Sequence, residues 1–277
     1  MAKIDFGHPL AEQALLPAHS ISWQVFKNPV SLFIGGVAAV ILELAEPRVR
    51  AGVWEHTSFR TDPVTRLQRT GMAAMVSVYA ARSQAERMIA GVNRRHARIT
   101  GLADDGQAYA ADAPELLNWV HATATYGFTE ARHRFVRPLS QAARDRAWAE
   151  AAVVGRLYGA TGAPTSQRQW EAQLRTMAPR LRPSPVIAEF LEILRQAELL
   201  PPPGRPLQQL LIRAAIELTP PDVAGALGLD RRRGLTPLEA RVVCAIARGA
   251  DRLLLSNAPP AQACRRLGLP ADWLYSP

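Results

Sequence analysis

Three of the six histidines, His56, His96 and His121, lie between Pro47 and Tyr126, in a segment that is also rich in arginine. A neutral imidazole is the most common protein ligand for transition metals and for haem iron. Arginine guanidinium groups bind carboxylates, such as the propionates of haem, through two parallel hydrogen bonds. The segment therefore contains the residue types that an iron or haem site needs.

Arg66 and Thr70 follow the helix-start signal Asp62-Pro63 and stand four residues apart. That spacing places both side chains on one face of a helix, one turn apart, with Arg69 on a neighbouring face. A solvated polar stripe is the ordinary interpretation of such a pattern. The apolar run Gly71–Met75 favours a cleft instead, because a helix buried in its second half tends to carry its first half into a cleft.

His96 is expected where a helix ends and a hairpin begins, flanked by Arg94, Arg95 and Arg98. The position suits a ligand, but also a histidine stabilised by the helix dipole or one in a basic surface loop. His121 is expected in mid-helix at the margin of an apolar face. A histidine there is most often buried and hydrogen-bonded to a neighbouring hydroxyl or carbonyl group.

Other sites remain open at this level. Non-haem iron is compatible with His96, His121 and a carboxylate such as Glu55 or Glu115. His56 lies near a helix end and is more typical of a packing or capping residue. The sequence contains no G-x-S-x-G elbow, no P-loop, no G-x-G-x-x-G after a strand and no H-E-x-x-H motif, which excludes the enzyme classes that depend on them.

Capping residues followed by proline recur along the chain and predict a succession of helices. The predicted helices cover about 28–46, 47–56, 62–81, 83–95, 112–135, 206–217 and 259–267, and four more begin at Ser140, Ser166, Ser184 and Thr236. Segments 97–100 and 107–110 flank Asp104-Asp105-Gly106, a turn signal that predicts a β-hairpin. The expected fold is all-α with one small hairpin.

The 277 residues are 48% hydrophobic, which is enough for a substantial core, and show no repeat. The Pro201–Gly204 stretch interrupts the helical pattern. We therefore expect a single domain over residues 1–277, with 204–277 as a candidate helical subdomain. The two cysteines, Cys244 and Cys264, suggest neither a disulfide framework nor a zinc site.

The net charge is +9, and only two of the 33 basic residues are lysines, Lys3 and Lys27. The arginines are dispersed rather than gathered in a basic block, which argues against a nucleic-acid partner and favours a solvated surface that can contact anionic lipid. The apolar run Ser31–Ala45 has about 15 residues, fewer than the ~20 that cross a bilayer, and predicts a core helix. The N-terminus has no signal-peptide pattern. We expect a cytoplasmic protein with peripheral membrane association.

The segment from Leu42 to Phe135 contains E-P-x-V-x-x-G-V, D-P-x-x-R-L-x-R-T, N-R-x-H-A-x-I-x-G, D-G-x-x-Y-x-A and P-E-L-L-x-W-V-H-A-T. These motifs resemble the oxygenase family typified by the mycophenolic-acid pathway oxygenase and the latex-clearing rubber oxygenases. The similarity extends over about residues 30–200. It implies an α-helical, globin-like fold that holds haem b, and O₂-dependent oxygenation or oxidative cleavage of an apolar, isoprenoid or lipid-like substrate.

The resemblance also implies roles for particular residues. His96, followed by Ala97 and by Ile99, matches the proximal iron ligand, and Arg66 and Thr70 match the distal polar pair. Arg69 stands where some rubber oxygenases have a lysine, so a distal lysine has no counterpart. Glu43 and Glu55 are the candidates for a distal glutamate. The arginines implied to surround the haem and its propionates are Arg94, Arg95 and Arg98.

His121 matches a second histidine motif of the family and is placed in the haem pocket without a role as ligand. Ala80 and Thr100 depart from the family pattern, in which glycine and arginine are expected. Two alternatives therefore stay open. One is a haem-binding protein without catalytic turnover, and the other is a cofactor-free helical scaffold.

Overall fold

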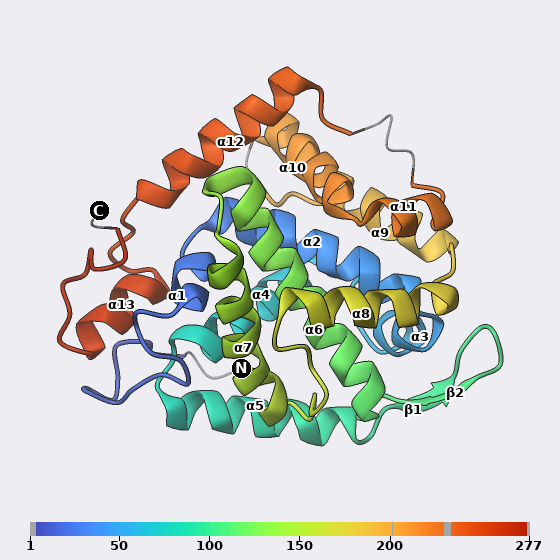
Figure 1. Ribbon diagram of the computed structural model, residues 1–277, viewed down its shortest axis with the longest axis horizontal. Coiled ribbons are helices and arrows are strands. Elements are labelled where there is room, and N and C mark those ends of the chain that lie inside the picture. The colour runs from blue at the N-terminus through green and yellow to red at the C-terminus, as the bar shows by residue number, and fades with distance from the viewer. Residues whose placement is uncertain (1–3, 201, 230–233, 276–277) are drawn as a thin grey trace.

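The computed structural model describes residues 4–200, 202–229 and 234–275, and most of them lie in α-helices (Figure 1). The helices are α1 (Ile21–Phe26), α2 (Pro29–Ala45), α3 (Pro47–Glu55), α4 (Pro63–Tyr79), α5 (Arg82–His96), α6 (Pro114–Ala131), the π-helix η1 (Arg132–Val136), α7 (Gln141–Leu157), α8 (Gln167–Met177), the short 3₁₀ helix η2 (Ala178–Arg180), α9 (Pro185–Gln196), α10 (Arg205–Leu218), α11 (Pro221–Ala226), α12 (Pro237–Arg252) and α13 (Pro259–Arg266). Strands β1 (Thr100–Leu102) and β2 (Ala108–Ala110) pair antiparallel, with Gly101 opposite Tyr109. The prediction of an all-α fold with one small hairpin is confirmed.

Most helices begin where the capping signals predict, because a side-chain oxygen accepts a hydrogen bond from an otherwise unpaired first-turn amide. The residues that cap in this way are Asn28, Glu46, Asp62, Ser140, Ser166, Ser184 and Thr236. At α12, which begins after Thr236 as predicted, Thr236 and Glu239 form a reciprocal capping box.

Two predicted helix starts are wrong. Ser83 does not cap α5; it lies inside the first turn, and its backbone N–H and hydroxyl donate to the Glu12 carboxylate at 2.6 and 3.0 Å. Asp112 does not cap α6, which begins at Pro114 after Ala113. The predicted long helix to residue 135 is divided, because α6 ends at Ala131 and a π-helix follows.

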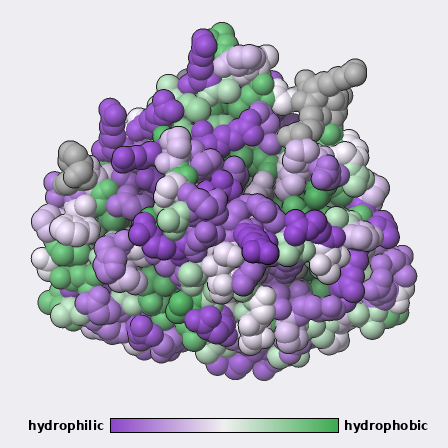
Figure 2. All heavy atoms as spheres, in the orientation of Figure 1, coloured by the Kyte–Doolittle hydropathy of each residue, from purple (hydrophilic) through white to green (hydrophobic). Residues whose placement is uncertain are grey.

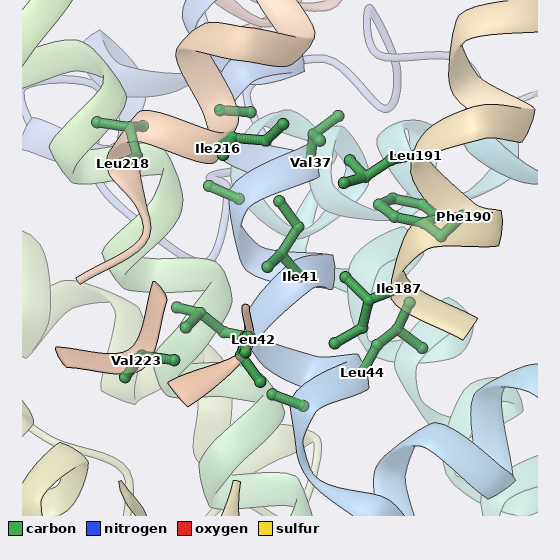
Figure 3. Close-up of a cluster of buried hydrophobic side chains, with 14 of the residues drawn as sticks. Val37, Ile41, Leu42, Leu44, Ile187, Phe190, Leu191, Ile216, Leu218 and Val223 are labelled. Atoms are coloured by element: carbon green, nitrogen blue, oxygen red, sulfur yellow. The ribbon is translucent and has the colours of Figure 1, made fainter. Parts of the chain in front are cut away.

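Helix α2 lies at the centre of the protein, and Figure 3 shows the cluster of buried side chains around it. Leucine and isoleucine side chains of α2 pack against residues of α9 on one side and of α10 and α11 on the other. The prediction that 31–45 is a core helix is therefore confirmed. No single helix in the described ranges is long and apolar enough to span a membrane, although the bent pair α2 and α3, 113° apart, passes the same test of length and composition.

Helices α2 and α6 cross in direct backbone contact. A Cβ atom at Gly35 would lie 2.5 Å from the carbonyl oxygen of Gly127, and a Cβ at Gly127 would meet the Gly35 carbonyl. Only glycine at both positions allows this approach. The crossing lies in the first half of α2, and in its second half the Glu43 carboxylate accepts a hydrogen bond from Thr123 of α6.

Pro201, the first residue of the predicted Pro201–Gly204 break, lies outside the described residues. On either side of the break, residues of α2, α9, α10 and α12 belong to one continuous hydrophobic cluster. The division of the chain into one domain or two stays a prediction.

Candidate functional site

His96 is the last residue of α5 and is partly buried. Its Nδ1 atom is buried without a hydrogen-bond partner. Burial lowers the pKa of His96, and the positive charges of Arg95 and Arg66 lower it further, whereas Asp112 opposes them. The imidazole is therefore neutral at pH 7, which is the form that binds a metal ion.

Arg66 and Thr70 lie on one face of α4, as predicted. The Thr70 hydroxyl donates to the Arg66 carbonyl oxygen at 2.9 Å, and the Arg66 guanidinium contacts the same hydroxyl. Helices α4 and α5 are joined by the short Ala80-Ala81 connection and pack against each other. The charge of Arg66 is close enough to His96 to lower its pKa, so the first half of α4 lies near the end of α5.

Glu43 of α2 completes this group of side chains. Thr123 of α6 donates a hydrogen bond of 3.4 Å to its carboxylate. Burial raises the pKa of Glu43 to about 7, although the Arg66 charge and the Thr123 hydrogen bond act to lower it. A carboxyl group with a pKa near neutrality can both accept and release a proton under ordinary conditions.

The structure thus distinguishes between the two candidate glutamates. Glu43 lies within electrostatic reach of Arg66. Glu55 is exposed at the end of α3 and interacts with Tyr109 of the hairpin, whose hydroxyl also lies 3.3 Å from the His56 ring. Thr123 stands in the quoted W-V-H-A-T motif, but no local pattern predicts its contact with Glu43.

Positive charge surrounds the His96 end of α5. Arg94 and Arg95 are in the last turn of the helix, Arg98 follows it, and all three are exposed, as is Arg69 on α4. Burial lowers the pKa of Arg66, and the nearby Arg69 charge adds to that effect. An anionic group placed here would reduce the repulsion among these arginines.

His121 is separate from this group. Thr123 faces α2, and two residues of an α-helix turn the chain by about 200°, so His121 faces the opposite side, toward α7. A Cβ atom at Gly155 would lie 2.8 Å from the His121 Nε2 and Cδ2 atoms. Burial lowers the pKa of His121 to about 4, and its Nε2 is buried without a partner.

The alternative non-haem site does not form. Among residues 4–200, 202–229 and 234–275, no three histidine, cysteine or acidic side chains lie close enough together to bind a metal ion. Glu115 instead bonds Arg48 and Arg180 at the surface. Haem needs one protein ligand rather than three, so this result does not affect a haem site.

The residues near His96 fit a haem group. The imidazole is neutral and has an unpaired nitrogen, and the exposed arginines beside it suit propionates. The α4 face next to Arg66 also has room: Thr70 is exposed, a Cβ at Gly71 would meet nothing within 4 Å, and Met72 is 39% exposed. The expected burial of 71–75 is therefore wrong for its first residues, since full burial begins at Val76.

The fold and this site define a class of helical proteins in which one histidine at a helix end lies within electrostatic reach of an arginine that contacts a threonine. A family model described as the catalytic domain of ER-bound oxygenase mpaB/B' and rubber oxygenase matches residues 23–252. The chain belongs to this family, and it is an oxygenase. The match confirms the resemblance and continues beyond residue 200. No curated protein and no solved structure matches the chain.

Proposed function

We propose that the protein is a haem b-dependent oxygenase that uses O₂ on an apolar, isoprenoid or lipid-like substrate, with His96 as the proximal iron ligand. The observation that carries the proposal is the neutral His96 imidazole, with its unpaired nitrogen, beside Arg66. Membership of an oxygenase family supports the reaction class. The apolar substrate and the cytoplasmic, peripherally membrane-associated location remain parts of the same proposal.

The bound haem would supply the iron chemistry with O₂. His96 would hold the haem from the end of α5, and Arg94, Arg95 and Arg98 would pair with its propionates. Arg66 and Thr70 would orient polar atoms on the oxygen side, because their mutual contact fixes the guanidinium.

Glu43 would act as the proton acceptor and donor of the site. Its raised pKa of about 7 and its place beside Arg66 support this role. Thr123 would hold the carboxyl group in position through its hydrogen bond. His121, on the other side of α6, would support the pocket from behind by its packing on Gly155.

Haem content tests the ligand. His96→Ala should lose most or all of the Soret absorption of the purified protein while far-UV circular dichroism stays helical. His56→Ala serves as the matched control, because His56 contacts Tyr109 of the hairpin. If His96→Ala keeps a full Soret band and His121→Ala loses it, His121 is the iron ligand and His96 is not. If neither substitution changes haem content, the proposal fails.

Turnover tests the polar pair. Arg66→Ala and Thr70→Val should retain haem and reduce turnover, or the lifetime of the oxygen complex, about tenfold or more, as when one preorganised polar contact is removed. Thr176→Val is the matched control, since the Thr176 hydroxyl makes the same bond to a carbonyl four residues earlier, on α8. If both variants lose haem but keep the same turnover per bound haem, Arg66 and Thr70 hold the haem site together and do not act in the reaction.

A further inference from the structure

The C-terminal part of the protein exposes an unusual amount of apolar surface. Eleven large hydrophobic side chains are exposed in the described ranges, and six of them lie in α12 or in the residues that follow it, up to residue 275. They are Leu238, Val242, Leu253, Leu254, Leu255 and Trp273, exposed by 69, 41, 57, 36, 49 and 47%. Such a gathering marks a surface that contacts another apolar phase.

Exposed arginines occur among these side chains on α12. Leu238, Arg241, Val242 and Arg252 recur at helical spacing, so they share the outward side of the helix. Arg248 lies at the margin of that side, and its Nε donates to the Val136 carbonyl oxygen of η1 at 3.2 Å. The inward side carries Val243 and Ala247, which are fully buried. In Figure 1, α12 lies along the upper left edge of the protein, and its outward side faces away from the other helices.

The acidic residues of α12 do not weaken this positive charge. Glu239 bonds Arg213 and the Thr236 cap. Asp251 turns inward and pairs with Lys27 and Arg132 at 3.3 and 2.9 Å. A helix face with apolar and basic residues together is typical of segments that lie on an anionic membrane surface.

The ammonium group of Lys27 joins the end of α12 to the C-terminal segment. Its Nζ donates to the carbonyl oxygens of Asp251 at 3.0 Å and of Leu274 at 2.8 Å. The backbone at Asp251 and the backbone at Leu274 therefore lie close together. Their chain neighbours, Arg252 and Trp273, are both exposed.

Arg265 of α13 extends the positive charge to the connection between α12 and α13. Its guanidinium donates to the Ser256 carbonyl oxygen at 2.6 Å, next to the three leucines. Figure 2 shows hydrophobic atoms along the left edge of the protein, over this connection. Asp272 is an exposed acid beside Trp273, and the three exposed arginines of the surface, Arg241, Arg252 and Arg265, outnumber it.

We propose that this surface binds the face of an anionic lipid bilayer. The α12 outer face is defined by Leu238, Arg241, Val242, Arg252, Leu253–Leu255, Arg265 and Trp273. The leucines and the indole enter the interface between head groups and acyl chains, and the arginines pair with lipid phosphates. The charge complementarity between three arginines and an anionic surface selects lipid rather than a second protein. This proposal specifies the peripheral membrane association proposed above, and the binding does not depend on haem or on the proposed reaction.

The test is cosedimentation of the purified protein with vesicles of phosphatidylcholine, with and without phosphatidylserine. Replacing Leu253, Leu254 and Leu255 together by serine should weaken binding to the anionic vesicles about tenfold or more, because their apolar area stays in water. Arg241→Gln with Arg252→Gln should weaken it about fivefold per arginine at low salt. That second effect should shrink at high salt, because charges are screened over about 10 Å at 0.1 M.

Matched controls lie elsewhere on the surface. Leu10→Ser with Leu102→Ser removes two leucines that are 70 and 66% exposed, and Arg168→Gln with Arg175→Gln removes two exposed arginines of α8. Binding of these variants should match the original protein, and haem content should be unchanged in all of them. Equal losses in the controls, or no loss in the α12 variants, would overturn the proposal. A concentration-dependent dimer by light scattering that the leucine variant abolishes would assign the surface to a second copy instead.

Discussion

Glu43→Gln should make the protein more stable at alkaline pH, because the carboxyl group is held where its charged form is disfavoured. Its pKa is raised from 4.5 to about 7, chiefly by burial. Glutamine has nearly the same shape and can still accept the Thr123 hydrogen bond, so the substitution removes the charge and little else. The effect should therefore depend on pH in a way that a packing change does not.

The sign follows from the raised pKa. Below about pH 4.5 the carboxyl group is protonated in both the folded and the unfolded chain, and it has no pH-dependent effect. As the pH rises toward 7, the unfolded chain loses the proton and the folded chain keeps it, so stability falls; above 7 the loss is complete. The rise in the pKa of Glu43 corresponds to a loss of about 3 kcal/mol in the free energy of unfolding, since each pKa unit is worth about 1.4 kcal/mol. Because Glu43 keeps some contact with solvent, we expect the loss of stability to be about 1–3 kcal/mol.

Urea unfolding of the original protein and of Glu43→Gln, at pH 5 and at pH 8, measures this difference. The advantage of the variant should be small at pH 5 and larger by about 1–3 kcal/mol at pH 8. Glu171→Gln on the exposed side of α8 provides the control for the loss of one negative charge. A stability difference that is the same at both pH values would refute the argument that Glu43 resists ionisation, and with it the role proposed for this residue.

Two further substitutions test the surroundings of the site and the anchor of α12. Gly155→Ala should destabilise the protein by about 1–3 kcal/mol in urea unfolding, because the new Cβ displaces the His121 ring, whereas Gly249→Ala, with open space around it, should be neutral or stabilising. Asp251→Ala should lower the free energy of unfolding by about 3–5 kcal/mol in the same assay, since it leaves the buried Lys27 and Arg132 without their carboxylate partner. A loss below about 1 kcal/mol would contradict the interpretation that this carboxylate stabilises the two buried cations.

The local features of the fold could be predicted from the sequence. Asn28, Asp62 and Thr236 begin helices where expected, because a cap depends only on hydrogen bonds to amides two or three residues away. The contact of Arg66 with Thr70 follows in the same way from the spacing of one helical turn. Ser83 failed as a cap because a distant carboxylate, that of Glu12, binds its amide and hydroxyl instead.

The sequence by itself determined the all-α class, most of the longer helices and the hairpin, since each depends on residues a few positions apart. Its motifs also indicated the family and, through that resemblance, the candidates His96, Arg66 and Thr70. Only the tertiary structure decided that Glu43 rather than Glu55 stands beside Arg66, and that His121 turns toward α7. Those outcomes depend on the close crossing of α2 over α6 at Gly35 and Gly127, which brings distant segments together. Burial and electrostatic neighbours, and hence the pKa of Glu43, arise only from such packing, because no local pattern specifies which helix faces which.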